Sequence, residues 1–475
     1  MSTFSELGLA SKLVERLDQQ GYETPTAVQE KAIPAFKKNN GDMIVQAQTG
    51  TGKTAAFGLP ILEQGVSPNG SVRALILTPT RELALQVAKE LGRLNIDPSL
   101  SIVSIVGGMD IGKQIQGLKR NATIVVGTPG RLIDHVKRKT LKLGDIQTSV
   151  LDEADEMLQQ GFVEEIEDLL SHCPEKTRLL FFSATMPREV KRLAETYMDE
   201  PENIQIERTQ GPMIDQIYFE VKARDKEEAL CRLIDQADEM YAIIFCRTKL
   251  MVDELTERLR QRRYGVEALH GDLSQSQRNK VLNQFRQQRC KLLVATDAAA
   301  RGIDVSQLTH VINFSFPQDD ESYVHRIGRT GRAGKTGIAI TLITPNEHYK
   351  WQRLQKTLKV TVKKHAIPSI DAVVKAKEQQ AKAKIEAIIA NEVEPEYQEM
   401  ADTLMTEHDP KVVIAAMVKQ LCRNAFDRKA YQKMADLFQQ QSRGSREPSR
   451  RKPGFRGKRS GGYKGKFKPA RKDRY

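Results

Sequence analysis

Short apolar runs alternate along this chain with longer stretches that have the spacing of helices. The runs are continuously apolar, which is typical of strands buried on both faces of a parallel sheet. The predicted strands are 42–47, 73–78, 101–106, 123–126, 149–151 and 178–182 in the first half, and 216–221, 242–246, 266–269, 291–295, 309–314 and 337–343 in the second. Helical stretches such as 80–94, 252–263 and 274–287 lie between them. Because strand–helix alternation occurs twice, the pattern predicts an α/β fold with two domains, each built on a parallel sheet.

A polar segment, 207–212 (Glu-Arg-Thr-Gln-Gly-Pro), separates the two halves and ends in Gly-Pro. We expect this segment to be the linker between domains at 1–206 and 213–368.

The pattern changes after residue 368, where Ala, Lys, Glu and Gln dominate and strand-like runs stop. Residues 369–441 are therefore predicted to form a small all-α region. Asp409 and Pro410 predict a helix start, with an N-cap followed by proline at the first helical position. Apolar residues that fit helical faces are Val373, Val374, Ile385, Ile388, Ile389, Val412, Val413, Met417 and Leu421. Because about 70 residues of helix make a thin core, this region would gain from packing on the second domain or on a copy of itself.

Composition adds a charge asymmetry to this picture. The chain has 475 residues, of which 39% are hydrophobic, so it is not a wholly disordered protein. Its net charge is +13, but residues 442–475 alone carry 14 Lys and Arg against two acids. Because this segment has almost nothing to bury, we expect a disordered basic tail on a nearly neutral body.

Cysteine usage and hydropathy indicate the compartment. The five cysteines are odd in number, far apart and never in a CxxC pair, which argues against a disulfide framework and a zinc site. No apolar stretch approaches the length of a membrane span, and residues 1–20 lack the apolar core of a signal peptide. We expect a cytoplasmic protein with reduced thiols and no membrane partner.

A glycine-rich loop follows the first predicted strand and opens a helix. Its sequence is Ala-Gln-Thr-Gly-Thr-Gly-Lys-Thr over 47–54. The glycines let backbone N–H groups turn toward a polyphosphate, and the helix N-terminus favours negative charge. Lys53 would reach the β- and γ-phosphates, and the Thr54 hydroxyl would hold Mg²⁺. The alternative is a chance glycine-rich turn, which the flanking strand and helix disfavour.

An acidic motif, Asp152-Glu153-Ala154-Asp155, follows the predicted strand 149–151 directly. Asp152 can coordinate Mg²⁺ through water, and Glu153 can polarise an attacking water. Acidic clusters also occur on solvated faces. This motif therefore indicates a nucleotide site only in combination with the phosphate loop.

An ordered set of motifs over about 4–343 resembles the DEAD-box RNA helicases. In the first half the matching residues are Phe4, 21–29 (Gly-Tyr-Glu-Thr-Pro-Thr-Ala-Val-Gln), the phosphate loop, 79–84, 128–131, 152–155 and 183–185. In the second half they are 244–246, 270–272, 296–297, 300–304 and 325–332. The resemblance implies two RecA-like domains that close on ATP and RNA together.

The resemblance also implies a role for each motif at the nucleotide. Gln29, in a motif over 2–30, would pair with adenine while Phe4 stacks on it. Arg329 and Arg332 would be arginine fingers that reach the γ-phosphate, and Asp304 would touch the ribose. The loop residues expected to bind ATP are Gln48, Thr49, Gly50, Thr51, Gly52, Lys53 and Thr54. Residues expected to couple the site to domain closure are Asp155, Ser183, Thr185 and His325.

RNA contacts are implied at strand ends of both domains. Threonine hydroxyls, glycine amides and single arginines can hold phosphates and 2′-hydroxyls without reading bases. The candidates are Pro79, Thr80, Arg81, Gly107, Gly108, Thr128, Pro129 and Arg131 in the first domain, and Arg247, Gly271 and Thr296 in the second. Each could be merely a turn, and only their joint order favours RNA.

The tail 442–475 predicts a further RNA contact. Its cations are interleaved with Phe455, Tyr463 and Phe467, and rings of this kind can stack on bases while cations neutralise phosphates. The alternative is a plain solubility tail.

Together these motifs predict an ATP-dependent RNA helicase whose RNA-stimulated ATP hydrolysis drives local unwinding of short duplexes. The helical region and basic tail are similar to those of bacterial cold-shock DEAD-box helicases. That similarity implies a homodimer through 369–441, work in ribosome assembly or RNA decay, stress response, and ribosomal or RNA-decay proteins as partners. The alternatives are an ATP-gated RNA clamp without unwinding and a DNA translocase.

Overall fold

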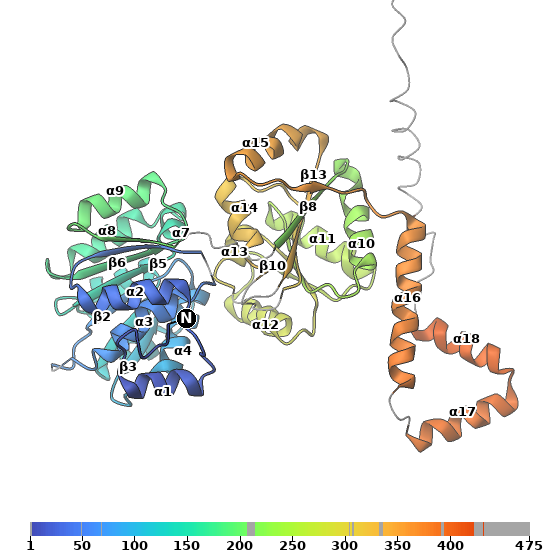
Figure 1. Cartoon of the computed structure of the whole chain (residues 1–475), viewed down its shortest axis with the longest axis horizontal. Coiled ribbons are helices and arrows are strands. Elements are labelled where there is room, and N and C mark those ends of the chain that lie inside the picture. The colour runs from blue at the N-terminus through green and yellow to red at the C-terminus, as the bar shows by residue number, and fades with distance from the viewer. Residues whose placement is uncertain are drawn as a thin grey trace, which may run out of the picture. The chain divides into compact units, whose positions relative to one another are not determined.

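The computed structural model describes residues 2–48, 50–67, 69–206, 214–303, 305, 308–331, 336–390, 394–421 and 431. The predicted linker 207–212 and tail 442–475 lie outside these residues, as do Thr49, Asp304 and Arg332. The domain boundaries at the linker therefore stay a prediction. We call 2–206 lobe one and 214–368 lobe two (Figure 1).

Lobe one is built on a seven-stranded sheet in the order β3-β4-β2-β5-β6-β1-β7, and every neighbouring pair is parallel. Six strands confirm the predicted ones: β1 (Met43–Gln46), β2 (Ala74–Leu77), β3 (Ser101–Ile105), β4 (Ala122–Gly127), β5 (Thr148–Asp152) and β6 (Arg178–Ser183). The sequence pattern missed β7 (Glu202–Gln205), because this edge strand is polar and mostly exposed.

Helices cover both faces of this sheet. They are α1 (Ser11–Gln19), α2 (Ala27–Lys38), α3 (Lys53–Glu63), α4 (Arg81–Leu94), α5 (Ile111–Lys119), α6 (Pro129–Lys137), α7 (Ala154–Gln159), α8 (Val163–Ser171) and α9 (Arg188–Tyr197). Successive strand residues point to opposite sides, so Phe182 packs with the core under α2 and α3 while Phe181 packs with the core under α8 and α9. Burial on both faces explains why the strands read as continuous apolar runs.

Lobe two repeats this topology strand for strand. Its order is β10-β11-β9-β12-β13-β8-β14, and all its neighbouring pairs are parallel. The strands are β8 (Ile214–Glu220), β9 (Ala242–Phe245), β10 (Val266–Leu269), β11 (Leu292–Ala295), β12 (His310–Asn313), β13 (Gly337–Ile343) and β14 (Lys363–Lys364). The six predicted strands are confirmed, and β14, a two-residue lysine edge, was missed. Two such parallel sheets confirm the predicted tandem RecA-like fold.

The helices of lobe two lie between its strands in the chain. They are α10 (Lys226–Gln236), α11 (Lys249–Gln261), α12 (Gln275–Arg286), α13 (Asp297–Ala300), α14 (Asp320–Ile327) and α15 (His348–Leu358), with short 3₁₀ turns η1 (Ala223–Asp225) and η2 (Pro345–Glu347).

The predicted all-α region contains α16 (Ile370–Ile389), α17 (Pro395–Glu407) and α18 (Pro410–Leu421). The start of α18 at Pro410 confirms the predicted helix start. The first half of α16 packs on lobe two, since Val373 and Val374 are buried and Lys377 pairs with Asp235 at 3.0 Å. Toward the end of α16 the predicted apolar face is exposed, and Ile389 is 71% exposed.

Two findings bear on the compartment. Of the helices formed by the described residues, none has the length and apolarity needed to cross a membrane. The described cysteines, Cys173, Cys231, Cys246 and Cys290, are free thiols. Burial raises the pKa of Cys246 to about 12, so this thiol stays protonated and unreactive at neutral pH.

The chain's single tryptophan anchors the core of lobe two and yields a test. Trp351 is fully buried and its ring lies 5.4 Å from that of Tyr218 and 5.7 Å from that of Tyr323. We expect Trp351→Ala to lower the free energy of unfolding by about 3–5 kcal/mol, measured by urea denaturation with circular dichroism. Tyr349→Ala, on the exposed face of the same helix, is the control and should change it by less than about 0.5 kcal/mol. Equal effects of the two changes would contradict this packing.

Candidate nucleotide and nucleic-acid sites

The phosphate loop connects β1 to α3 at the carboxyl edge of the sheet, where ligands of open α/β folds bind. Gly50 and Gly52 have left-handed backbones, with φ of 83° and 89°, which residues with a side chain rarely adopt. Lys53 begins α3 and is only 5% exposed. Its ammonium has no hydrogen-bond partner among the described residues. An unpaired buried ammonium is costly unless a ligand pairs with it.

Asp152 supplies a second unpaired group at the same edge. It ends β5 and is 3% exposed, and its Oδ1 has no hydrogen-bond partner in the described part of the chain. Burial raises the pKa of Asp152 to about 7, although the charge of Lys53 acts in the opposite direction. The pair of orphaned groups fits a polyphosphate beside the lysine and a divalent cation beside the carboxylate.

Glu153 follows Asp152 in a left-handed conformation, with φ of 55° and ψ of 52°. This conformation is uncommon for a residue with a side chain, and such strain is concentrated at functional sites. The turn starts α7 directly after the strand, so that Glu153 and Asp152 stand at the same sheet edge.

Gln29 is hydrogen-bonded to the phosphate loop, and the sequence did not predict this contact. Its Oε1 accepts a hydrogen bond from the Thr26 backbone N–H at 2.9 Å, and its Nε2 donates to the Gly52 carbonyl at 3.2 Å. A Cβ on Gly52 would lie 2.5 Å from that nitrogen, so only glycine fits. The amide keeps one donor and one acceptor position, and its pairing with adenine stays a prediction. Phe4 is 3% exposed and meets Tyr22 edge to face.

Asp155, Ser183 and Thr185 form a closed hydrogen-bond network. Asp155 Oδ2 accepts from both the backbone N–H and the hydroxyl of Thr185, at 2.8 and 2.7 Å. The Ser183 hydroxyl accepts from the Asp155 N–H at 3.3 Å and donates to the Thr185 carbonyl at 2.6 Å. The structure therefore brings the three residues together as expected, and their role in domain closure stays a prediction.

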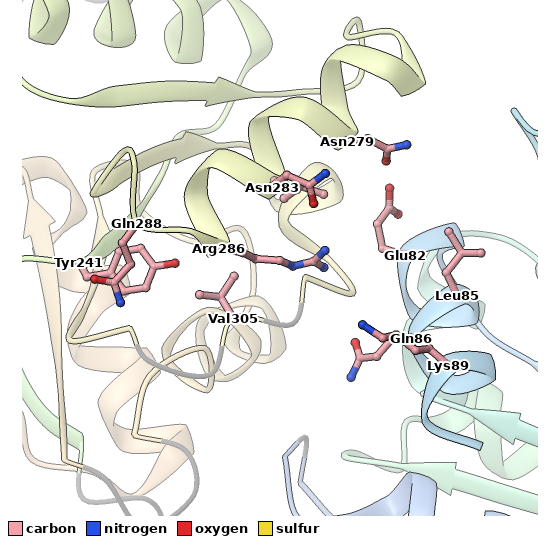
Figure 2. Close-up of a pocket in the computed structure, with 11 residues that line it drawn as sticks. Glu82, Leu85, Gln86, Lys89, Tyr241, Asn279, Asn283, Arg286, Gln288 and Val305 are labelled. Carbon is pink, nitrogen blue, oxygen red and sulfur yellow. The ribbon is translucent and has the colours of Figure 1, made fainter. Parts of the chain in front are cut away.

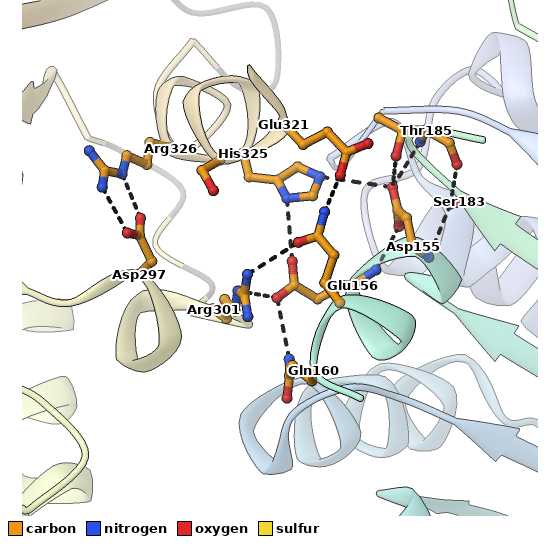
Figure 3. Close-up of polar contacts among 12 residues, drawn as sticks. Asp155, Glu156, Gln160, Ser183, Thr185, Asp297, Arg301, Glu321, His325 and Arg326 are labelled. Atoms are coloured by element: carbon orange, nitrogen blue, oxygen red, sulfur yellow. Dashed lines mark hydrogen bonds and ion pairs between the residues drawn. The ribbon is translucent and has the colours of Figure 1, made fainter. Parts of the chain in front are cut away.

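His325 joins this network from lobe two (Figure 3). Its Nε2 lies 3.9 Å from Asp155 Oδ2 and its Nδ1 lies 3.3 Å from Glu156 Oε2. Burial alone would lower the pKa of His325, but the hydrogen bond to Glu156 and the charge of Asp155 raise it overall. Arg301 of lobe two also pairs with Glu156. Glu156 was missed because the acidic motif ends one residue earlier.

The arginines of α14 and the loop after it differ in their surroundings. Arg326 is 2% exposed and donates to both carboxylate oxygens of Asp297, at 2.5 and 2.7 Å, and to the Ser315 carbonyl at 2.8 Å. Arg329 is 8% exposed, donates to the Ile303 carbonyl at 3.2 Å and lines a small cavity with His325. Arg326 is thus held within lobe two.

Most of the predicted RNA contacts line one cavity of about 490 Å³. The predicted residues that line it are Pro79, Thr80, Arg81, Gly107, Thr128, Arg131 and Gly271. Gly108 lies beside them, since a Cβ there would be 2.3 Å from the Arg81 guanidinium.

Three predicted residues lie away from this lining. Pro129 is the buried first residue of α6, Arg247 is exposed after β9, and Thr296 precedes α13.

Sequence reasoning missed two residues of α12 in the cavity lining. Gln275 accepts a hydrogen bond from the Arg81 guanidinium at 3.2 Å, and Arg278 forms an ion pair with Glu82 of α4. Both contacts join lobe two to α4. Long polar residues on a helix surface carry no sequence signal of such a role.

A second, larger cavity of about 550 Å³ lies beside Glu82 (Figure 2). Side chains of α4, including Gln86 and Lys89, face Asn283 and Arg286 of α12 across it. It contains none of the predicted site residues.

Comparison with known proteins places this geometry in a family. The family model of the DEAD/DEAH box helicases matches residues 26–193, and that of the helicase conserved C-terminal domain matches 225–334. The chain is 47% identical over 426 residues to the DEAD-box ATP-dependent RNA helicase CshA of Geobacillus kaustophilus, which covers 89% of this chain and 91% of that protein. It is 44% identical over 427 residues to CshA of Bacillus subtilis, covering 90% and 86%.

Solved structures show the same arrangement of elements. S. cerevisiae Dbp5 bound to RNA and ADP BeF3 is similar with a TM-score of 0.72 and 33% identity, covering 80% of this chain and 99% of that one. Mss116p bound to ssRNA and AMP-PNP is similar with a TM-score of 0.71 and 28% identity, covering 82% and 85%.

The link between Gln29 and the phosphate loop can be tested by replacing one atom. In Gln29→Glu, a carboxylate can still accept from Thr26, but it cannot donate to the Gly52 carbonyl and would repel it. We expect affinity for a fluorescent ATP analogue to fall about ten-fold, the usual effect of leaving a buried acceptor unpaired. Gln19→Glu, at an exposed position of α1, serves as the control. Unchanged affinity in Gln29→Glu would contradict the link.

Proposed function

Because the chain belongs to the DEAD-box ATP-dependent RNA helicases, we propose that RNA stimulates its ATP hydrolysis and that this hydrolysis drives local separation of short RNA duplexes. The observation that carries the proposal is the division of the site. The Lys53 ammonium and Asp152 Oδ1 are buried in lobe one without a hydrogen-bond partner among the described residues, whereas Arg329 is held in lobe two. A nucleotide bound at lobe one needs lobe two to complete its surroundings.

The residues of lobe one divide the chemistry among them. Lys53 and the amides of Gly50 and Gly52 bind the β- and γ-phosphates, and Glu153 orients the attacking water. Thr54 and Asp152 would hold Mg²⁺, which would neutralise phosphate charge. Gln48, Thr49 and Thr51 complete the loop around the phosphates. Phe4 and Gln29 select adenine.

Lobe two supplies the transition-state charge. Arg329 and Arg332 approach the γ-phosphate as arginine fingers, and Asp304 holds the ribose. His325 couples this approach to the acidic motif through Asp155, which Ser183 and Thr185 already orient.

RNA bound across both lobes would hold them together around ATP. The side chains that line the 490 Å³ cavity suit the phosphates and 2′-hydroxyls of a single strand, and they present few groups for reading bases. Arg247 and Thr296 extend this path on lobe two. A strand gripped at its backbone is bent away from duplex geometry, so pairs separate locally.

The region 369–441 is proposed to form a homodimer in the cytoplasm. Large apolar side chains that would be covered in such a dimer are exposed on all three of its described helices: Ile388, Ile389, Tyr397, Met400, Val412, Ile414 and Met417. Large exposed apolar side chains gathered on the helices of one region favour an interaction surface there. The basic tail favours binding of structured RNA, and we infer that the protein works in ribosome assembly or RNA decay, with ribosomal or decay proteins as partners.

A strand-displacement assay separates unwinding from an ATP-gated clamp. We expect the wild-type chain to displace a short RNA strand with ATP and to hydrolyse ATP faster when RNA is present. Glu153→Gln should lower RNA-stimulated hydrolysis by roughly 10²-fold or more while RNA is retained with ATP. Glu175→Gln, at an exposed position, is the control. Hydrolysis at equal rates with and without RNA would refute the proposal, and hydrolysis without displacement would favour the clamp.

Deletion of 442–475 tests the tail. If about half of its 14 cations engage phosphates, the deletion should reduce the slope of log affinity against log salt by roughly 5. RNA binding should weaken at low salt while basal ATPase activity is kept. Fluorescence anisotropy over a salt series measures both effects. An unchanged RNA affinity would indicate a plain solubility tail.

A further inference from the structure

Helix α5 buries one residue, and that residue is polar. Gln114 is 4% exposed, whereas every other position of the helix is half-buried or exposed. Its Nε2 donates to the Val106 carbonyl at 2.8 Å, and its Oε1 lies 3.0 Å from His135 Nε2. A buried amide is stable only when both ends find partners. Gln114 therefore bridges two fixed points, one on a backbone and one on α6.

The hydrogen positions of this bridge follow from the backbone. A carbonyl can only accept, so the amide nitrogen of Gln114 faces Val106 and its oxygen faces His135. His135 Nε2 must then carry the proton. The other ring nitrogen, Nδ1, lies 2.9 Å from the Thr140 hydroxyl, whose single proton can be donated to Nδ1 or to the His135 carbonyl, 3.1 Å away. The part of the bridge with a fixed direction therefore runs from His135 Nε2 through Gln114 to Val106, and the Thr140 hydroxyl contacts its outer end.

The ring of His135 is suited to this neutral tautomer. It is fully buried, and burial is the main cause that lowers its pKa. The nearby charge of Arg131 lowers the pKa further, whereas that of Asp134 opposes this.

The two ends of the bridge lie at the predicted RNA contacts of lobe one. Val106 directly precedes Gly107 and Gly108, which pack against the Arg81 guanidinium. His135 lies on α6, whose first turn carries Thr128 and Arg131.

Two further bonds tie the end of β3 and this loop to the start of α6. The Thr128 N–H donates to the Ile105 carbonyl at 3.2 Å, and Arg131 donates to the Met109 carbonyl at 2.8 Å. Arg131, a proposed RNA contact, therefore holds the loop 106–110 from one side, and the buried Gln114 holds it from the inner side.

We propose that Gln114 and His135 are positioning residues for RNA, because they fix the glycine loop at 107–108 relative to the helix that carries Thr128 and Arg131. Contacts made by glycine amides have no side chain that can adjust, so the loop must be placed by what lies beneath it. An apolar residue at 114 would fill the space equally well but would leave the Val106 carbonyl unpaired. The inference rests on the proposed RNA contacts of this lobe and extends them to residues that cannot touch RNA.

The test compares RNA affinity with nucleotide affinity in the full-length chain. Gln114→Met keeps the side-chain length and removes both hydrogen bonds, and Gln114→Glu keeps the acceptor for His135 but loses the donor to Val106. Thr140→Val removes only the hydroxyl that lies beside His135 Nδ1. Gln116→Met, at an exposed position of α5, is the matched control. The probe is a fluorescent single-stranded oligouridine with AMP-PNP, and circular dichroism verifies folding.

We expect Gln114→Met and Gln114→Glu to raise the dissociation constant for the oligouridine about ten-fold. The affinity for AMP-PNP alone should change less than two-fold, a split that loss of general stability would not produce, since the nucleotide binds elsewhere on the same lobe. Thr140→Val should have a smaller effect and Gln116→Met none. Wild-type RNA affinity in both Gln114 variants would overturn the inference, as would an equal loss of RNA and nucleotide affinity. Neither result bears on RNA-stimulated hydrolysis in the wild-type chain, which tests the proposed function separately.

Discussion

Two buried ionisable side chains at one sheet edge govern the organisation of lobe one. The Lys53 ammonium and the Asp152 carboxylate both stand at the carboxyl edge of the sheet, and each leaves a polar atom unpaired in the described chain. Folding a chain around such groups costs free energy that ligand binding recovers. Burial raises the pKa of Asp152 to about 7, so this edge disfavours the charged form of the carboxyl group. Nucleotide binding and the stability of lobe one are therefore linked through these two side chains.

Duplication of the fold places complementary chemistry on two similar edges. The two sheets have the same strand order, so the strand ends of lobe two form an edge equivalent to that of lobe one. Lobe one presents glycine amides and acids there, whereas lobe two presents arginines. Arg326 and Asp297 satisfy each other inside lobe two, and this buried pair supports α14, which also carries His325. This pair therefore fixes the helix that extends toward the acidic motif.

The sequence predicted what depends on residue type at regular spacing, and it missed what depends on tertiary pairing. Continuous apolar runs located twelve strands, but β7 and β14 are polar edge strands whose pairing is made by the backbone. The phosphate loop and the acidic motif were predictable because their functional groups belong to a few adjacent residues. Glu156, Gln275 and Gln114 do not, because a polar residue on a helix acquires a partner only when another segment folds against it.

Backbone recognition of RNA explains why such hidden partners matter. A protein that grips phosphates and 2′-hydroxyls gains no information from base edges, so the shape of its groove must distinguish a bent single strand from a duplex. A groove whose shape is set by glycine loops is flexible unless rigid structure supports these loops from beneath. In lobe one the rigid element is a pair of buried hydrogen bonds from His135 through Gln114 to the Val106 carbonyl, with the Thr140 hydroxyl beside the outer ring nitrogen of His135. A helicase that reads shape therefore keeps part of its selectivity in residues that its substrate never touches.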